Sequence, residues 1–132
     1  MQKHTVVTGT VRRGRQDFTK RMSDHLQVFE AAFGCKPYAG TINVGVDPPI
    51  TIEPDCSIPD PIDPRQVLLI EKCLINGYPA FRIRPSVIAH PTVGGWGDQI
   101  IEVSSCAKIP GIEPGVTVTL EFFRELTLRF GN

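Results

Sequence analysis

The chain has 132 residues, of which 41% are hydrophobic and 21% are charged, and these proportions exclude an intrinsically disordered protein. The fourteen basic and fourteen acidic residues cancel, which argues against a nucleic-acid partner. The length predicts a single domain over residues 1–132. No apolar run reaches the length of a membrane span, and residues 1–4 carry no signal-peptide core. We therefore expect a cytoplasmic protein with no membrane partner.

A first strand is predicted over residues 5–11, which are rich in β-branched side chains, and a basic loop follows over 12–17. Asp24 and Gln27 have the spacing of a capping box, and Gly34 is suited to a left-handed helix stop. Between these signals hydrophobic residues recur on one face at helical spacing: Leu26, Phe29, Ala32 and Phe33. This pattern predicts one substantial helix.

Residues 41–47 alternate strictly, which predicts a strand with two different faces. One face carries Ile42, Val44 and Val46, and the other carries Thr41, Asn43 and Gly45. The proline-rich stretch 48–64 is too irregular for a strand or a helix and is expected to be a long surface connection. In a small domain such a connection often borders a site.

Two β-like runs, 67–75 and 80–88, surround Asn76 and Gly77, a pair that favours a two-residue type I′ hairpin turn. Pro79 suits only an edge or bulged position. A flexible loop is expected over 90–98; its Trp96 would stack on a ring ligand or cover the mouth of a barrel.

Strands are also predicted over 99–104 and 116–123, with a turn at 113–115 between them. Residues 126–130 are expected to close the sheet. Many strands with one helix and no βαβ alternation indicate a mainly β fold in the form of a small closed or half-closed barrel.

The four cysteines are widely scattered and none forms a C-x-x-C pair, and the three histidines also lack metal-ligand spacing. No zinc site is therefore expected. Two long-range disulfides and four free thiols are both compatible with the spacing, and the lack of a secretion signal favours the free thiols. The residues concerned are Cys35, Cys56, Cys73 and Cys106.

Residues 33–46, with the sequence FGCKPYAGTINVGV, resemble the signature L-G-F-x-P-Y-x-G-T-L-N-L of the archaeal CTP-dependent riboflavin kinases. Residues 99–103 (QIIEV) and 114–118 (PGVTV) are similar to that family's E-I-I-E-I-I-A-P segment and its later D-G-D-x-V turn. The resemblance implies a six-stranded cradle-loop (RIFT-like) barrel with one main α-helix. It also implies transfer of the γ-phosphate of CTP, or of another nucleoside triphosphate, to the 5′-hydroxyl of riboflavin, which gives FMN.

Thr41 and Asn43 are two residues apart on a predicted strand, so both side-chain oxygens project from the same face. Two neutral oxygens can hold a Mg²⁺ that takes its other ligands from phosphates and water. The alternative is that both side chains face solvent or satisfy backbone groups. The resemblance assigns this pair to the magnesium of the bound nucleotide.

Glu102 shares a face with Ile100 and Ser104, so it is either a surface charge on a strand or a group in a site. The matching glutamate of the family contacts the flavin, and the resemblance therefore implies that Glu102 does so here. The family's flavin-contacting threonine has Thr92 as a shifted substitute in this chain.

The family wraps its nucleotide with a loop of the form G-x-G-x-G-x-[YF], whereas residues 14–18 (GRQDF) keep only Gly14. Fewer glycines allow less close approach of the backbone to phosphates, so Arg12, Arg13 and Arg15 would supply guanidinium contacts instead. The alternative is a solvated basic loop.

A second nucleotide-contacting segment of the family, Leu-Arg, aligns with residues 109–110, and Lys108 beside it is the remaining candidate. Two other functions stay open at this point. One is a non-catalytic flavin- or nucleotide-binding barrel, and the other is a protein- or DNA-interacting barrel.

Overall fold

The computed structural model describes residues 5–13, 22–38, 40–47, 50–61, 63–86, 100–123 and 126–129. Within them the chain forms the helix α2 (Leu26–Phe33) and nine strands. The strands are β1 (Thr5–Arg12), β2 (Ile42–Gly45), β3 (Ile50–Ile52), β4 (Cys56–Pro59), β5 (Val67–Ile75), β6 (Tyr78–Pro85), β7 (Ile100–Ser104), β8 (Thr117–Phe122) and β9 (Leu126–Arg129). None of the helices in these ranges has the length and hydropathy that a membrane crossing requires.

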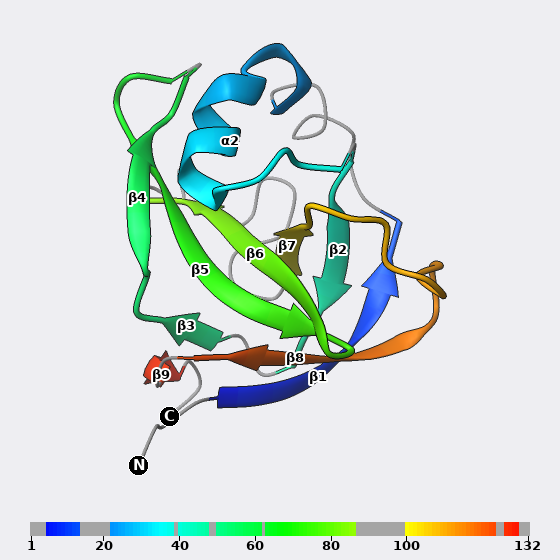
Figure 1. Ribbon diagram of the computed structural model, residues 1–132. Helices are drawn as coiled ribbons and strands as arrows, with labels where there is room; N and C mark the ends of the chain where they lie inside the picture. Colours follow the sequence, from blue (N-terminus) through cyan, green and yellow to red (C-terminus); the bar gives the residue numbers. More distant parts are fainter. Residues whose placement is uncertain are drawn as a thin grey trace.

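Six strands close into an antiparallel barrel in the order β5, β6, β7, β2, β1, β8, because β8 also pairs back with β5 (Figure 1). β4 pairs with the first half of β5, on the same edge whose second half pairs with β8, and β3 pairs with β9 in a separate two-stranded sheet. The predictions of a mainly β fold, a six-stranded barrel and one main helix are confirmed.

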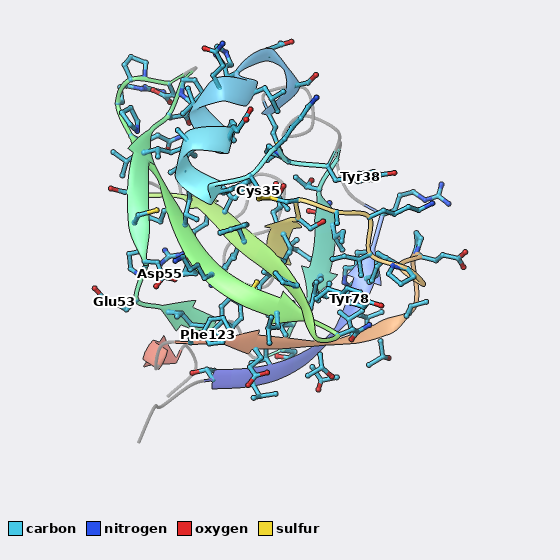
Figure 2. All side chains as sticks on the ribbon, viewed as in Figure 1. Cys35, Tyr38, Glu53, Asp55, Tyr78 and Phe123 are labelled. Carbon is cyan, nitrogen blue, oxygen red and sulfur yellow. A yellow bond between two sulfur atoms is a disulfide. The ribbon has the colours of Figure 1, made fainter. Side chains whose placement is uncertain are left out.

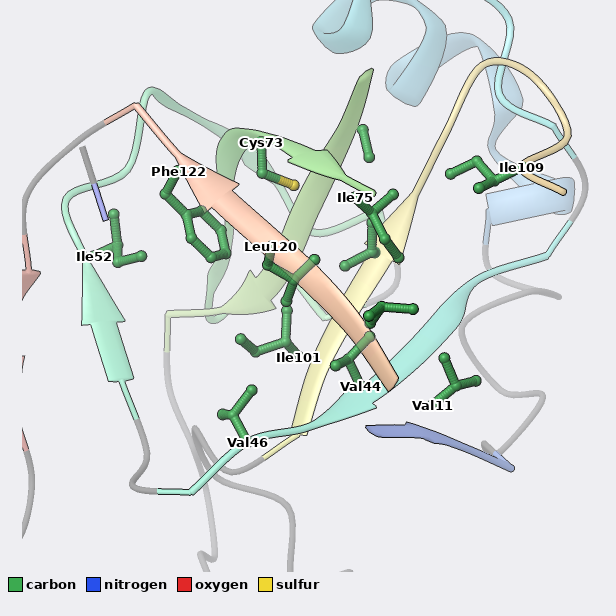
Figure 3. Packing of buried hydrophobic residues seen from close by; sticks show 13 residues of the cluster. Val11, Val44, Val46, Ile52, Cys73, Ile75, Ile101, Ile109, Leu120 and Phe122 are labelled. Atoms are coloured by element: carbon green, nitrogen blue, oxygen red, sulfur yellow. The ribbon is translucent and has the colours of Figure 1, made fainter. Parts of the chain in front are cut away.

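The barrel interior is filled by the side chains that each strand points inward. Figure 3 shows aliphatic and aromatic residues from β1, β2, β5, β7 and β8 meeting between the strands. Ile42 and Val44 of β2 belong to this core, as the alternation of the strand predicts. A Cβ on Gly9 would lie 2.5 Å from the Val44 side chain and 2.6 Å from the carbonyl oxygen of Gly45. Only glycine therefore allows β1 to approach β2 so closely.

α2 packs against the outer face of the barrel through its aromatic residues. Phe29 and Phe33 are buried, and the Phe33 ring stacks on Phe81 of β6 with ring centroids 4.3 Å apart. The same cluster takes in apolar side chains of β4, β5 and β6: Ile58, Leu68, Ile70 and Ile83. The helix therefore covers these three strands, and β7 lies at the margin of the covered area (Figure 1).

The two ends of α2 differ in whether a cap satisfies their free backbone groups. Gly34 has φ 76° and donates its N–H to the carbonyl oxygen of Glu30, so the predicted glycine stop is confirmed. The predicted capping box of Asp24 with Gln27 is wrong, because the N-cap residue is His25 and no side chain caps it. A backbone turn precedes the helix, in which the N–H of His25 donates to the carbonyl oxygen of Met22.

The proline-rich stretch is not the irregular connection that the sequence predicts, because it contains β3 and β4. β4 pairs in register with residues 67–70 of β5, and β3 pairs with β9. Pro59 ends an edge strand, where its missing N–H disrupts no ladder on the open side. The expectation that residues 126–130 close the sheet is also wrong, since β5 and β8 close it.

The turn between β5 and β6 is the predicted two-residue hairpin. Asn76 and Gly77 both have positive φ, 50° and 84°, as a type I′ turn requires. Pro79 lies in β6 beyond the part of the strand that pairs with β7, so its missing donor leaves no gap there.

Glu71 and Arg82 form an ion pair buried inside the barrel, with 1% of each side chain exposed. Arg82 Nη1 donates to Glu71 Oε1 at 3.2 Å, and Arg84 Nε donates to the same oxygen at 3.3 Å. Arg84 also donates from Nη2 to the carbonyl oxygen of Ile52 at 3.0 Å, which links β6 to β3. One carboxylate therefore holds two guanidinium groups against the inner wall.

Glu71→Ala should destabilise the fold by about 3–5 kcal/mol, because it leaves buried guanidinium charge without its carboxylate. Lys72→Ala is the matched control: Lys72 is the next residue on β5 and is exposed, so its removal should change stability by about 0.5 kcal/mol or less. The measurement is the free energy of unfolding in urea. Equal losses for the two variants would contradict a structural role for the ion pair.

The expectation of four free thiols is wrong for Cys35 and Cys106, which form a disulfide with their Cα atoms 6.0 Å apart. Cys56 is a free, exposed thiol and Cys73 is a free, buried one. Burial and, after it, the nearby Glu71 carboxylate raise the pKa of Cys73 from 9.0 to about 12. Cys73 is therefore a structural thiol.

Without reductant, one thiol per folded chain should react with a thiol-specific reagent, and a second should react only after unfolding. At about pH 8 the thiolate fraction of Cys73 is on the order of one in ten thousand, whereas Cys56 is accessible. Cys56→Ser should abolish the fast reaction. Four reactive thiols on unfolding without reductant would contradict the disulfide.

Candidate functional site

Asn43 lies directly opposite Glu102 on the neighbouring strand β7 and directly opposite Arg12 on β1. Their sequence neighbours Val44 and Ile101 point into the barrel core, so these three side chains point outward. We call Arg12, Asn43 and Glu102 the polar strip. Asn43 is only 8% exposed and Glu102 is half-buried, while Arg12 is exposed. The strip therefore runs from a sheltered carboxylate to an exposed cation.

Gly45 lets the Arg12 side chain lie across the outer face of β2. A Cβ on Gly45 would overlap the Nε and Cδ atoms of Arg12, so that side chain passes directly over the glycine. The guanidinium group is thereby held along β2, two residues from Asn43. Sequence reasoning placed Arg12 in a basic loop, whereas the structure places it at the end of β1.

Thr41 and Lys108, predicted to be a metal ligand and a nucleotide contact, line one hollow of about 270 Å³. We call it the barrel-end hollow, because it opens where β2 begins and β7 ends. Its remaining lining residues come from the same two segments and the loop before β8: Tyr38, Gly40, Ile42, Val103, Ser105, Ile109 and Ile112. Thr41 is half-buried and Lys108 is exposed, so a cation stands at the rim of a mostly apolar space.

A second hollow of about 570 Å³ lies between the start of the helical region and the segment that follows α2. We call it the helix-side hollow; its lining residues are Met22, Ser23, Leu26, Lys36, Pro37, Tyr38, Gly40 and Cys106. Tyr38 and Gly40 line both hollows, so the two spaces adjoin. Tyr38, which is labelled in Figure 2, is 48% exposed.

Sequence reasoning did not single out Tyr38 or the residues of the helix-side hollow. Leu26 was predicted to pack in the helix core, yet it is half-buried and lines this hollow. The available signal was that Pro37, Tyr38 and Gly40 lie inside the motif that carries the family resemblance. A tyrosine that is large and exposed next to Thr41 is a candidate for contact with a ring.

Three predicted site residues, Gly14, Arg15 and Thr92, lie outside the described residues, as does Trp96. Arg13 is described: it is exposed and directly follows β1, next to Arg12 of the polar strip. Its position is compatible with a contact to an anion bound along β2.

Thr41, Asn43 and Glu102 carry oxygen atoms, the ligand type that Mg²⁺ prefers. Thr41 and Asn43 offer a hydroxyl and an amide oxygen, and Glu102 offers a carboxylate opposite Asn43. In the part of the chain that the structure describes, no three histidine, cysteine, aspartate or glutamate residues cluster as a metal-binding group. A magnesium ion here would therefore depend on phosphate and water for its remaining ligands.

Comparison with models of known protein families and with curated proteins gives no match for this chain. The polar strip and the two hollows are separate features of this part of the barrel: Arg12, Asn43 and Glu102 are not among the residues that line either hollow.

Proposed function

We propose that this protein is a riboflavin kinase-like phosphotransferase. It moves the γ-phosphate of a nucleotide, CTP by resemblance, to the 5′-hydroxyl of riboflavin and forms FMN. The proposal includes a cytoplasmic location, where nucleoside triphosphates are available.

The pairing of Asn43 with Glu102 is the observation that carries this proposal. The resemblance assigns Asn43 to the metal of the nucleotide and Glu102 to the flavin. A phosphotransferase must bring a donor and an acceptor within reach of each other, and adjacent positions on β2 and β7 meet that requirement. Asn43 and Glu102 are far apart in the sequence and become neighbours only through the pairing of β2 with β7.

Phosphoryl transfer needs positioning and neutralisation of negative charge more than it needs a strong base. Thr41 and Asn43 would hold the Mg²⁺, which when bound neutralises charge on the phosphates. Lys108, which lines the barrel-end hollow with Thr41, and Arg12, which lies along β2, would supply positive charge for the phosphates. Glu102 can accept a hydrogen bond from a hydroxyl of the acceptor and so orient it.

The flavin ring would occupy the helix-side hollow, whose lining residues do not include Glu102 itself. Met22, which lines this hollow, contacts Ser104 on the outer face of β7, two residues from Glu102. The volume of about 570 Å³ lies in the usual range for small-molecule sites. Tyr38 offers an aromatic surface and Lys36 a cation at this hollow.

The decisive assay incubates the purified protein with riboflavin, Mg²⁺ and either CTP or ATP, and separates FMN from riboflavin by chromatography. Formation of FMN with one nucleotide supports the proposal and identifies the donor. Binding of riboflavin or nucleotide without FMN would replace it with a non-catalytic binding barrel. Binding of neither would leave a protein- or DNA-interacting barrel as the function to test.

Asn43→Ala should weaken Mg²⁺–CTP binding about tenfold or more, because it removes one oxygen that would hold the metal. Lys108→Ala should weaken nucleotide binding to a similar degree and more strongly at low salt. Titration calorimetry measures both, and urea unfolding checks that each variant is folded. Lys72→Ala is again the control, since Lys72 lines neither hollow. A loss of affinity in Lys72→Ala equal to that in Lys108→Ala would contradict the assignment.

A further inference from the structure

The Cys35–Cys106 disulfide joins two segments that both line the candidate site. Cys35 directly follows Gly34, the residue at which α2 ends, and Cys106 lies two residues beyond β7. Figure 2 shows Cys35 where the chain leaves α2 and turns toward Tyr38. The crosslink therefore ties the end of the helix to the end of a barrel strand.

The residues next to each cysteine line the two hollows. We call residues 36–38 with Gly40 the helix-side wall, and residues 105–109 the strand-side wall. Tyr38 N–H donates to the carbonyl oxygen of Ser105 at 2.7 Å, so one hydrogen bond joins the walls close to the disulfide. The disulfide and this hydrogen bond hold the same two segments together.

The barrel and the helix have packing of their own that does not involve the disulfide. Phe33 stacks on Phe81, and Phe29 is completely buried, so α2 stays on the sheet through aromatic contacts. The barrel closes through the pairing of β5 with β8. Loss of the disulfide should therefore affect mainly the short segment between α2 and β2.

Cys106 borders a space that a small reductant could enter. Cys106 is half-buried and lines the helix-side hollow of about 570 Å³, which has room for a small dithiol. A disulfide in a reducing compartment is usually transient or redox-sensing rather than a permanent structural link. The proposed cytoplasmic location therefore favours a reversible link.

We propose that the Cys35–Cys106 disulfide is a redox clamp on the candidate site. When oxidised it holds the helix-side wall against the strand-side wall in the form that binds ligand, and when reduced it releases the helix-side wall. The ligand identity and the reducing compartment in this proposal rest on the proposed function; the crosslink between the two walls does not.

The chemistry is ordinary thiol–disulfide exchange with a dithiol as reductant. A thiolate of the dithiol attacks one sulfur of the pair, which breaks the protein disulfide and gives a mixed disulfide and one cysteine thiolate. The second thiol of the reductant then displaces the other cysteine. Both cysteines end as thiols after protonation, and the dithiol is oxidised to a disulfide.

Hydrogen exchange followed by mass spectrometry tests the clamp without any ligand. Peptides containing Tyr38 should exchange about tenfold faster after treatment with dithiothreitol, while peptides from the β5–β6 hairpin should not change. The Cys35→Ser/Cys106→Ser double variant should exchange fast with or without reductant. Cys56→Ser, which alters an exposed free thiol elsewhere, should behave as the unaltered protein does.

The binding arm uses riboflavin and Mg²⁺–CTP as probes, each titrated into oxidised and reduced protein. The dissociation constant of the probe that binds should rise about fivefold on reduction, and the double variant should show the weaker value in both conditions. If the double variant does not fold, reduction of the unaltered protein gives the same comparison.

Unchanged exchange at Tyr38 on reduction would overturn the clamp, whatever the probes do. Faster exchange with unchanged affinity would overturn the link between the clamp and the site. If neither probe binds in either redox state, the proposed function and the link to the site both fail, and the exchange measurement still decides whether the disulfide holds the two walls together.

Discussion

Antiparallel pairing of β5 with β8 closes the sheet into a barrel, and this closure decides which way each side chain points. In a closed sheet every second residue faces a space that water cannot fill, so those positions must be apolar or carry a charge that meets an opposite charge. Val44, Ile101 and Leu120 meet the first condition, and the ion pair of Glu71 with Arg82 meets the second. The residues between them must then face outward.

The candidate site is a consequence of that outward alternation. α2 covers the outer face of β4, β5 and β6 with apolar contacts, and the polar strip continues the same face onto β7, β2 and β1. The helix-side wall and the strand-side wall line the two hollows, whose lining residues do not include Arg12, Asn43 or Glu102. The disulfide between Cys35 and Cys106 fixes the spacing of these walls without contributing to the barrel itself.

Local patterns in the sequence predicted the elements whose signals are local. The alternation of β2 placed Asn43 outward, and Asn76 with Gly77 predicted the hairpin turn correctly. β3 and β4 were missed because their hydrogen bonds come from other segments, β9 and β5, while Pro59 in β4 and the prolines on either side of β3 argue against strands. The sequence does not reveal that Glu71 is buried, because it is followed by another charged residue, Lys72, which is exposed.

We propose that the outer face of β2 and β7 and the two hollows together bind riboflavin and nucleotide. Backbone amide resonances recorded by NMR during titration with riboflavin, and separately with Mg²⁺–CTP, test this residue by residue. The changes in chemical shift should concentrate at Tyr38, Thr41, Asn43 and Glu102 and along residues 105–109, while the tip of the β5–β6 hairpin at Asn76 should stay unchanged. Shifts concentrated on β3 and β9, with none at Asn43 or Glu102, would contradict the proposal.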